Sequence, residues 1–275
     1  MTDQPVHSNP VLGIDIGGSG IKGAPVDLTT GELAQKRLRI PTPEKSTPKN
    51  VAKVVGEIVA HFAEQIGPQG PIGITIPAVV THGRTRSAAN IDKSWIDAEA
   101  EKIFEDHLGR DIYLVNDADA AGVAEVHYGA AKDHPGLVLL TTLGTGIGSA
   151  LVYRGVLIPN TEFGHLEIDG HDAESRAASS IKDKEGLSYT EWAKRLQRYY
   201  ERVEALLWPD LIVIGGGVSK DADKFLSKIK VHAEVVPAKL LNTAGIVGAA
   251  WLAADRSAHG EPGEPLQQGN PVDPA

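Results

Sequence analysis

Short apolar runs separated by glycine turns dominate the first forty residues of the chain. A strand-like run from Val11 to Ile16 leads into the segment GGSG, and further strand-like runs follow at Ile21 to Leu28 and Leu33 to Ile40. Apolar runs of this length joined by glycine turns are typical of paired strands. We therefore expect an antiparallel meander at the start of the chain.

The apolar positions next recur at the spacing of an amphipathic helix. Thr47 can cap this helix, with Pro48 at its first position. The apolar positions on its buried face are Val51, Val54, Val55, Ile58, Val59, Phe62 and Ile66. Beyond it, the pattern predicts three more elements: a buried strand at 71–77, a helix at 97–108, and a strand at 111–115 that ends in Asn116 and Asp117.

The same pattern begins again in the second half of the chain. The predicted elements are a helix at 118–128, strands at 137–143 and 149–153, a helix at 188–207, a strand at 211–214 that runs into Gly215 to Gly217, and a helix at 244–254. The segments IDIGGSGIKGAPV and LTTLGTGIGSALV both have the form strand, glycine-rich turn, strand. This weak internal repeat predicts two similar α/β lobes that face one another.

The length of the chain fits two ordinary domains or one large one, at 275 residues and 29.1 kDa. We expect a small N-terminal lobe formed by residues 10–117 and 244–256, and a larger C-terminal lobe formed by residues 118–243. Residues 1–9 have the character of a frayed end, and residues 257–275 are rich in Gly, Pro and polar residues without periodicity. Both ends are therefore expected to be disordered.

The composition argues against several classes of protein. The chain is 41% hydrophobic and 23% charged, with no long apolar run and no charged-then-apolar leader, so we expect a soluble, cytoplasmic protein without a membrane partner. Its formal net charge of −9 argues against a general nucleic-acid binder, so a polyanionic ligand needs a local positive groove. Because the chain contains no cysteine, it can form neither a disulfide nor a thiolate zinc site.

The segment GIDIGGSGIKG contains a match to a dinucleotide-binding fingerprint. Gly18, Gly20 and Gly23 stand in G-x-G-x-x-G register after the first strand. A dinucleotide site needs a helix after these glycines, and Pro25 with strand-like runs on both sides argues against one. The chain also lacks the G-x-x-x-x-G-K-[ST] pattern. Two interpretations remain: a hairpin tip that cradles phosphate, and a glycine hairpin without a ligand, which the loop alone favours.

Several motifs taken together resemble a known family from about Val11 to Ala254. They are D-I-G-G-S-G-I-K-G, N-D-A-D-A-A, L-G-T-G-I-G, E-F-G-H and I-G-G-G. In this order they resemble the ROK branch of sugar kinases, in the actin-like hexokinase superfamily. The segments A-A-N-I-D-K-S-W, P-N-T-E-F-G-H-L-E, W-P-D and N-T-A-G-I-V-G-A-A look most like the polyphosphate glucokinases and related glucomannokinases of actinobacteria. The implied fold is α/β, an actin-like ATPase (ribonuclease H-like) fold of two lobes with a cleft between them.

The resemblance implies a kinase that phosphorylates glucose at O6. Inorganic polyphosphate and also ATP would be the donors, Mg²⁺ the cofactor, and a homodimer the assembly. An ATP-dependent or broader glucose/mannose kinase is the nearest alternative. A non-catalytic sugar sensor of the family would carry an N-terminal helix-turn-helix, for which the residues before the first strand leave no room. A nicotinamide oxidoreductase is disfavoured by the missing helix after Gly23.

Asp117 is the candidate catalytic residue. It follows a strand, at the carboxyl end where ligands bind in open α/β sheets, and the resemblance implies that it takes the proton of the sugar 6-hydroxyl. The alternative role is a helix N-cap, for which Asp119 is also available. We interpret Asp119 as structural. The sugar-binding positions that the resemblance implies are Asn90, Asn116, Asp117, Glu162, His165 and Glu174.

One departure from the family concerns zinc. Many ROK kinases carry a Cys-rich zinc motif after their E-x-G-H, and this chain has no cysteine, so we expect no zinc. His165 is then interpreted as a sugar contact or as a scaffold for one, with a buried, backbone-satisfied histidine as the alternative. Glu174 follows the missing segment, so its match to the family crosses an alignment gap.

The glycine turns form the candidate donor site. The resemblance implies that Asp15 holds Mg²⁺, directly or through water, while backbone N–H groups bind the phosphates. The implied phosphate-binding residues are Gly17, Gly18, Ser19, Gly20, Gly144, Thr145 and Gly146. We add Lys22, which stands on the outgoing strand of the first hairpin, and Lys220, which stands beside the third glycine turn. Gly215, Gly216 and Gly217 resemble the turn that lies against adenosine in ATP-using relatives, and a close strand-to-helix turn is the alternative.

A linear polyphosphate needs a cationic track into the same phosphate site. Two sets of basic residues have the i, i+4, i+8 spacing of one helix face: Lys194, Arg198 and Arg202, and Lys220, Lys224 and Lys228. The second set starts beside the third glycine turn and is the better candidate. A solvated helix face is the alternative for both sets.

Overall fold

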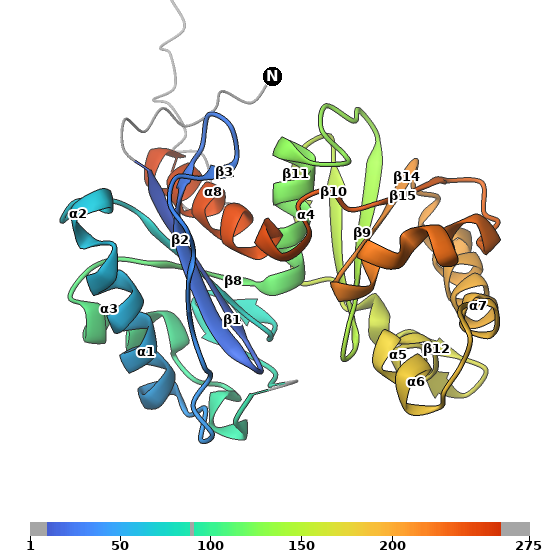
Figure 1. Cartoon of the computed structure of the whole chain (residues 1–275), viewed down its shortest axis with the longest axis horizontal. Helices are drawn as coiled ribbons and strands as arrows, with labels where there is room; N and C mark the ends of the chain where they lie inside the picture. Colours follow the sequence, from blue (N-terminus) through green and yellow to red (C-terminus); the bar gives the residue numbers. More distant parts are fainter. Residues whose placement is uncertain (1–9, 89–90, 260–275) are drawn as a thin grey trace, which may run out of the picture.

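Two mixed β-sheets lie on either side of a pair of packed helices (Figure 1). The computed structural model describes residues 10–88 and 91–259. The first sheet has the strand order β3-β2-β1-β5-β8, with β4 also paired to β2, and the second has the order β11-β10-β9-β14-β15. The predicted Asn90 and both chain ends lie outside the described residues.

The strands have the following bounds. The first sheet contains β1 (Val11–Gly17), β2 (Gly20–Asp27), β3 (Glu32–Leu33), β4 (Leu38–Ile40), β5 (Ile72–Ile76) and β8 (Tyr113–Asn116). The second contains β9 (Leu137–Leu143), β10 (Ile147–Tyr153), β11 (Val156–Ile158), β14 (Leu211–Gly215) and β15 (Glu234–Pro237). Two short hairpins are formed by β6 (Val80–Thr81) with β7 (Arg84–Thr85), and by β12 (Glu167–Ile168) with β13 (His171–Asp172).

The two sheets share one topology. In each, three consecutive strands pair antiparallel, and two later strands are added in parallel beside the first of them. IDIGGSGIKGAPV forms the β1–β2 hairpin, and LTTLGTGIGSALV forms the β9–β10 hairpin. The predicted meander and the internal repeat are therefore both confirmed.

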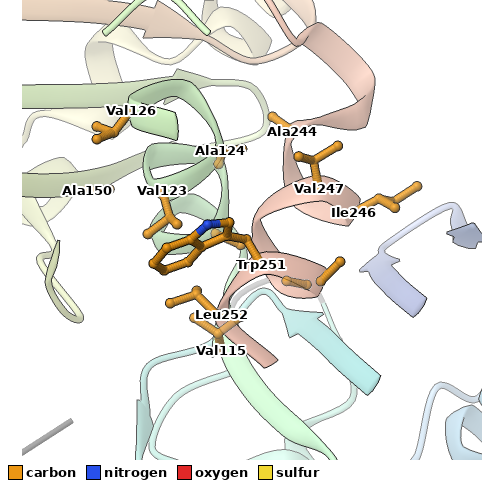
Figure 2. Close-up of a cluster of buried hydrophobic side chains, with 14 of the residues drawn as sticks. Val115, Val123, Ala124, Val126, Ala150, Ala244, Ile246, Val247, Trp251 and Leu252 are labelled. Carbon is orange, nitrogen blue, oxygen red and sulfur yellow. The ribbon is translucent and has the colours of Figure 1, made fainter. Parts of the chain in front are cut away.

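Helices α4 (Asp117–Tyr128) and α8 (Ala244–His259) form the layer between the sheets. Figure 2 shows the small and branched side chains that fill this layer, with Trp251 of α8 beside Val123 of α4. The Trp251 ring stacks on His127 with centroids 3.8 Å apart. Burial lowers the pKa of His127 to about 4, so this imidazole is neutral in the apolar layer.

Three glycines allow α8 to approach its neighbours closely. A Cβ at Gly13 of β1 or at Gly73 of β5 would overlap carbonyl oxygens of α8, and a Cβ at Gly248 of α8 would overlap the carbonyl oxygen of Ala120 in α4. These neighbouring atoms are backbone, which cannot move without moving a whole helix or strand. The glycines thus set the distance between the helix pair and the first sheet, and with it the position of Asp117 at the start of α4.

The outer faces of both sheets are covered by further helices. In the first sheet the cover is α1 (Pro48–His61), α2 (Ala63–Ile66) and α3 (Ala100–Leu108), and in the second it is α5 (Glu174–Ala177), α6 (Ser179–Lys184) and α7 (Tyr189–Leu207). Thr47 is the N-cap residue of α1 and Pro48 its first residue, as predicted. No helix in residues 10–88 or 91–259 is long and apolar enough to span a bilayer.

Two elements that were each predicted to be continuous are divided in the structure. The first helix ends at His61, because Phe62 leaves helical geometry (φ −103°, ψ 13°) before α2 begins, and this break still allows Phe62 to be buried. The run from Leu33 to Ile40 forms two short strands. Its two ends pair with opposite ends of β2, so the residues between them leave the sheet.

The predicted helix at 97–108 begins later than expected. Asp97 has a φ of 57°, a left-handed conformation that cannot continue a right-handed helix. The α-helix therefore starts at Ala100, after a 3₁₀ turn at Lys93–Trp95.

Candidate active site

The tips of two glycine hairpins line one cavity with a volume of about 920 Å³. The lining residues from these tips are Gly17, Gly18 and Ser19 between β1 and β2, and Gly144, Thr145 and Gly146 between β9 and β10. The first tip leads directly into the antiparallel strand β2, so no helix follows it. The fingerprint match is therefore not a dinucleotide site of the strand–helix type, as predicted from Pro25.

The second tip is held by the segment that carries α5 and α6. Ser180 Oγ donates to the carbonyl of Thr145 at 2.7 Å, and Ser179 Oγ donates to that of Gly144 at 3.1 Å. Just past the tip, the backbone N–H of Ile147 donates to Glu174 Oε2 at 3.0 Å. The tip is therefore fixed before any ligand binds, which is what a preorganised anion site requires.

Asp117 lies at the point where β8 ends and α4 begins, and it lines the same cavity as both tips. Burial among protein atoms raises its pKa to about 7, and the negative charge of Asp15 contributes further in the same direction. A hydrogen bond from the Ala118 N–H at 2.9 Å opposes this shift. A carboxyl group whose pKa is close to neutrality is suited to accept and release protons.

The N-cap of α4 is Asn116, and neither aspartate of the following turn takes this role. Asn116 Oδ1 accepts hydrogen bonds from the N–H groups of Ala118 at 2.8 Å and Asp119 at 3.1 Å, and its Nδ2 donates to the carbonyl of Ala78. The alternative interpretation of Asp117 as the cap is therefore wrong. Asn116 lines the cavity, but these bonds already engage both ends of its amide.

Asp119 has the structural surroundings expected of it. Its Oδ2 accepts the N–H of Asn160 at 2.7 Å. The amide of Asn160 in turn pairs with Val80, accepting from its N–H at 2.9 Å and donating to its carbonyl at 2.7 Å. Burial raises the pKa of Asp119 to about 7 as well. This chain of bonds joins α4, the segment before Glu162 and β6 at the border of the cavity.

Three predicted sugar-binding side chains converge on one side of the cavity. Glu162 lies 3.8 Å from His165 Nε2, and Glu174 lies 3.9 Å from His165 Nδ1. All three line the same cavity as Asp117. Burial raises the pKa of Glu162, His165 counteracts this, and Glu174 adds to it. His165 is more than half exposed, with Asp172 3.3 Å from Nδ1, so the alternative of a buried, backbone-satisfied histidine is wrong.

A smaller cavity of about 160 Å³ shares Asp117, Thr142 and Gly216 with the first and contains the predicted metal-binding residue. Asp15 accepts from Lys22 Nζ at 3.2 Å and from Thr75 Oγ1 at 3.0 Å. Asp117 lines both cavities, and Gly215 and Gly216 line the smaller one. The residue pair Asp15 and Asp117 thus places two carboxylates on one small polar space.

These two carboxylates fit a hard cation. Mg²⁺ is commonly bound by one or two carboxylates together with water and substrate phosphates. The charge of Asp15 acts to raise the pKa of Asp117, and a cation held by Asp15 would relieve this repulsion. Within the described part of the chain, no group of three or more His, Cys, Asp or Glu residues is arranged to hold a metal by itself.

Gly216 forms a close turn against the second hairpin. Its φ is +81°, and a Cβ there would lie 2.6 Å from the backbone nitrogen of Leu143. Gly215, Gly216 and Gly217 therefore form a strand-to-helix turn, which was the alternative interpretation, and the first two also border the smaller cavity. Among the described residues, the predicted Gly20, Gly217 and Lys220 line neither cavity.

The predicted stripe of Lys220, Lys224 and Lys228 is not one helix face. These residues lie on two 3₁₀ helices, η3 (Gly217–Lys224) and η4 (Leu226–Lys228), which are interrupted at Phe225. Positions four apart do not align in a 3₁₀ helix, because it has three residues per turn. Lys224 is also paired with Asp221 at 2.6 Å.

The other predicted stripe lies on a regular helix. Lys194, Arg198 and Arg202 all belong to α7, but Arg198 is paired with Asp169 at 2.9 Å. In the structure as described, none of the three lines either cavity.

Sequence reasoning missed several polar residues of the two cavities. They are Ser87, Thr142, Ser149, Thr161 and Asn242 in the linings, and Thr75 beside Asp15. Thr75 is found only through the pairing of β1 with β5, which sets it opposite Asp15. Thr142 and Thr161 stand inside the quoted motifs, so their position next to the glycine turn and to Glu162 was the available signal.

The described fold and site are those of a sugar kinase in which two glycine hairpins and a carboxylate share one cavity. The model of the ROK family matches residues 11–180, and the chain belongs to this family.

Particular relatives are similar over nearly the whole chain. The polyphosphate glucokinase of Mycobacterium tuberculosis (strain ATCC 25618 / H37Rv) is 52% identical over 90% of this chain and 92% of its own length. That of Mycobacterium leprae is 50% identical over 90% of this chain and 76% of its own length. The crystal structure of the inorganic polyphosphate/ATP-glucomannokinase from Arthrobacter sp. strain KM superposes with a TM-score of 0.87 at 48% identity, covering 90% of this chain and 100% of that one.

Proposed function

We propose that this protein transfers a phosphoryl group to O6 of glucose, with inorganic polyphosphate and ATP as donors. The observation that carries this proposal is the position of Asp117, a carboxyl group with a pKa of about 7, in one cavity with the tips of both glycine hairpins. The names of the relatives at 48–52% identity supply the substrate and the donors.

The geometry supports a direct in-line transfer. Asp117 accepts the proton of the 6-hydroxyl as O6 bonds to the terminal phosphorus, and the bond from phosphorus to the bridging oxygen breaks. The donor leaves as polyphosphate shortened by one residue, or as ADP. Backbone N–H groups at the tips of the two hairpins hold the terminal phosphoryl group in position. Glu162, His165 and Glu174 hydrogen-bond to the other sugar hydroxyls and orient O6 toward Asp117.

The donor site is proposed to use Mg²⁺ held by Asp15. When bound, the ion would neutralise charge on the donor phosphates. Lys22, which pairs with Asp15 and lines the same smaller cavity, contributes a second positive charge.

The proposal is tested by supplying purified protein, glucose and Mg²⁺ with polyphosphate or ATP in separate reactions and measuring glucose 6-phosphate. Product with polyphosphate is the expected result. Product with ATP alone would assign the chain to the ATP-dependent alternative, and binding of glucose without turnover on either donor would indicate a sugar sensor.

A second acceptor, mannose, is favoured by one observation. The relative of known structure at 48% identity is a glucomannokinase. Mannose differs from glucose only in the configuration at the 2-hydroxyl. The same assay with mannose therefore measures how strongly the protein discriminates between the two sugars at that position.

Glu162→Gln is expected to raise the KM for glucose about tenfold while changing the KM for the donor less than twofold, because a neutral amide is a weaker hydrogen-bond acceptor for a sugar hydroxyl. Steady-state kinetics with each substrate varied in turn measures both constants. Glu167→Gln, an exposed position on β12, is the matched control. A larger effect on the donor constant than on the glucose constant would contradict the assignment of Glu162 to the sugar.

We propose that the lobes are formed by residues 10–117 with 244–256 and by residues 118–243, a division supported by the two sheets of equal topology. We also propose a homodimer, which size-exclusion chromatography with light scattering would test.

A further inference from the structure

We propose that the polyphosphate chain leaves the smaller cavity, which contains Asp15, across β2 and β4. On this path it would cross a row of three cations formed by Lys22, Arg39 and Arg37. This inference rests on the proposed use of polyphosphate as a donor. It concerns the polyphosphate residues beyond the reacting phosphoryl group. For these residues the sequence predicted a track over the basic residues of η3, η4 and α7.

The row starts at the smaller cavity and runs outward across the first sheet. Lys22 of β2 is directly opposite Asp15 of β1 on one side and Arg39 of β4 on the other. Side chains directly opposite one another in antiparallel strands project from the same face of the sheet. Lys22 lines the smaller cavity beside Asp15, so Arg39 extends the same face by one strand, about 5 Å further out.

Both arginines contact the border of the cavities through backbone carbonyls. Arg39 Nη2 donates to the carbonyl of Ser19 at 2.9 Å, at the tip of the first hairpin. Arg37 Nη1 donates to the carbonyl of Asn242 at 3.2 Å, and Asn242 lines the smaller cavity. The two guanidinium groups are therefore anchored at two separate points, one on the border of each of two cavities that share Asp117 and Gly216.

The absence of a side chain at Gly20 makes room for this arrangement. A Cβ there would lie 2.7 Å from Nε of Arg39 and 2.8 Å from its Cζ. Among the described residues, Gly20 lines neither cavity, and its contact is with the Arg39 guanidinium group beside the hairpin tip.

Two of the three charges in the row are free for a ligand. In the part of the chain that the structure describes, no carboxylate forms an ion pair with Arg37 or Arg39, whereas Lys22 is paired with Asp15. In the two predicted stripes, Lys224 and Arg198 are each paired with an aspartate. A guanidinium group has five N–H donors, so one bond to a carbonyl leaves most of them available.

A linear polyphosphate fits this row better than a nucleotide does. Every residue of the polymer carries negative charge, so each cation along its path has a partner, and the protein as a whole is acidic, with a net charge of −9. A nucleoside would instead need an apolar surface beyond its phosphates. We therefore expect Arg37 and Arg39 to bind the part of a long chain that a short donor does not reach.

The test compares three donors, long-chain polyphosphate, tripolyphosphate and ATP, on the full-length variants Arg37→Gln, Arg39→Gln and the double variant. Each single substitution is expected to raise the KM for long-chain polyphosphate about tenfold, through loss of charge-assisted hydrogen bonds, and to change the KM for ATP and the value of kcat less than twofold. The effect on tripolyphosphate should be smaller than that on the long chain.

Two control variants identify the source of any effect. Lys53→Gln removes an exposed cation on α1, which covers the opposite face of the same sheet, and should leave all three donors unchanged. The double substitution of Lys220 and Lys224 by Gln tests the competing track. Raising the salt concentration should increase the KM for long-chain polyphosphate more steeply in the wild type than in the arginine double variant. The reason is that the wild type has two more cations whose attraction to the polymer is screened by salt.

The outcomes separate this inference from the proposed function. Wild-type protein without activity on polyphosphate would disprove the proposed donor itself. Wild-type activity with an unchanged KM for long chains in the arginine variants would overturn the row while leaving the function intact. Equal losses with ATP and polyphosphate would also overturn it, since the arginines would then act on the hairpin tip. A selective effect of the lysine pair would assign the track to η3.

Discussion

Asp117→Asn is expected to abolish phosphoryl transfer from both polyphosphate and ATP. An amide has nearly the shape of the carboxylate but cannot accept the proton of the 6-hydroxyl, and loss of a general base lowers kcat by about 10²- to 10⁴-fold. The KM for glucose should change little, because the sugar-binding side chains of Glu162, His165 and Glu174 remain. Initial rates of glucose 6-phosphate formation and glucose binding by calorimetry measure the two quantities.

The pH dependence of the wild-type enzyme follows from the same residue. Burial, together with the charge of Asp15, raises the pKa of Asp117 to about 7. Only the ionised carboxylate accepts a proton, so kcat/KM for glucose should increase as the pH rises through the pKa of Asp117, which is about 7 without the cation and lower when Mg²⁺ relieves the repulsion from Asp15. A rate that is independent of pH in this range would contradict the role of Asp117 as the base.

The raised pKa also predicts how Asp117 affects stability. The unfolded chain ionises this group near 3.8, whereas the folded protein resists ionisation until about 7. Its contribution to stability is therefore fully present below the first value and is lost as the pH rises through the second. Asp117→Asn does not undergo this loss, so thermal unfolding should show a higher Tm for the variant than for wild type above neutral pH.

Asp119→Asn is the matched control for this substitution. Asp119 lies in the same turn, is buried, and also has a pKa raised to about 7, but its Oδ2 is occupied by the N–H of Asn160. Asparagine retains an oxygen acceptor for that bond, so this variant should keep most of its activity. If both substitutions abolished turnover equally, the effect would come from disturbing the first turn of α4, and Asp117 would lose its assignment as the base.

Local sequence signals were sufficient for the elements that surround the site. The glycine segments predict two hairpins because glycine turns between apolar runs leave few other conformations, and Thr47 with Pro48 predicts the start of α1. Asp117 was placed at a strand end from the apolar run before it. These features depend on residues close in sequence, so they can be predicted from a single sequence.

The remaining features depend on contacts between distant segments. Phe62 is buried as its helical spacing predicts, but the spacing does not report that its backbone leaves helical geometry there. Asn116 is the N-cap because the helix begins at Asp117, and its amide also donates to the carbonyl of Ala78, a residue far away in the sequence. The row formed by Lys22 and Arg39 exists only through the register of β2 with β4. No local spacing in the sequence reports such a register.

Gly248→Ala is expected to destabilise the protein by about 3 kcal/mol or more, a size typical of severe overpacking. The added methyl group would overlap the carbonyl oxygen of Ala120, so α8 and α4 would have to separate. This movement would open the layer that contains Val123 and Trp251 and would displace Asp117 at the start of α4. Urea denaturation followed by far-UV circular dichroism measures the loss of stability, and kcat at a temperature where the variant is folded measures the displacement.

Gly56→Ala provides the matched comparison, since it makes the same substitution inside a helix. A Cβ at Gly56 of α1 would lie 3.0 Å from the far end of the exposed His107 ring, which can rotate away, and at ordinary contact distance, 3.9 Å, from Leu108 Cδ2. Alanine has the higher helix propensity, so this variant should be unchanged or more stable by up to about 1 kcal/mol. Equal stability changes in the two variants would show that helix propensity, rather than the close contact of α8 with α4, determines the effect at Gly248. Destabilisation at Gly248 alone is the outcome expected if this contact sets the position of Asp117.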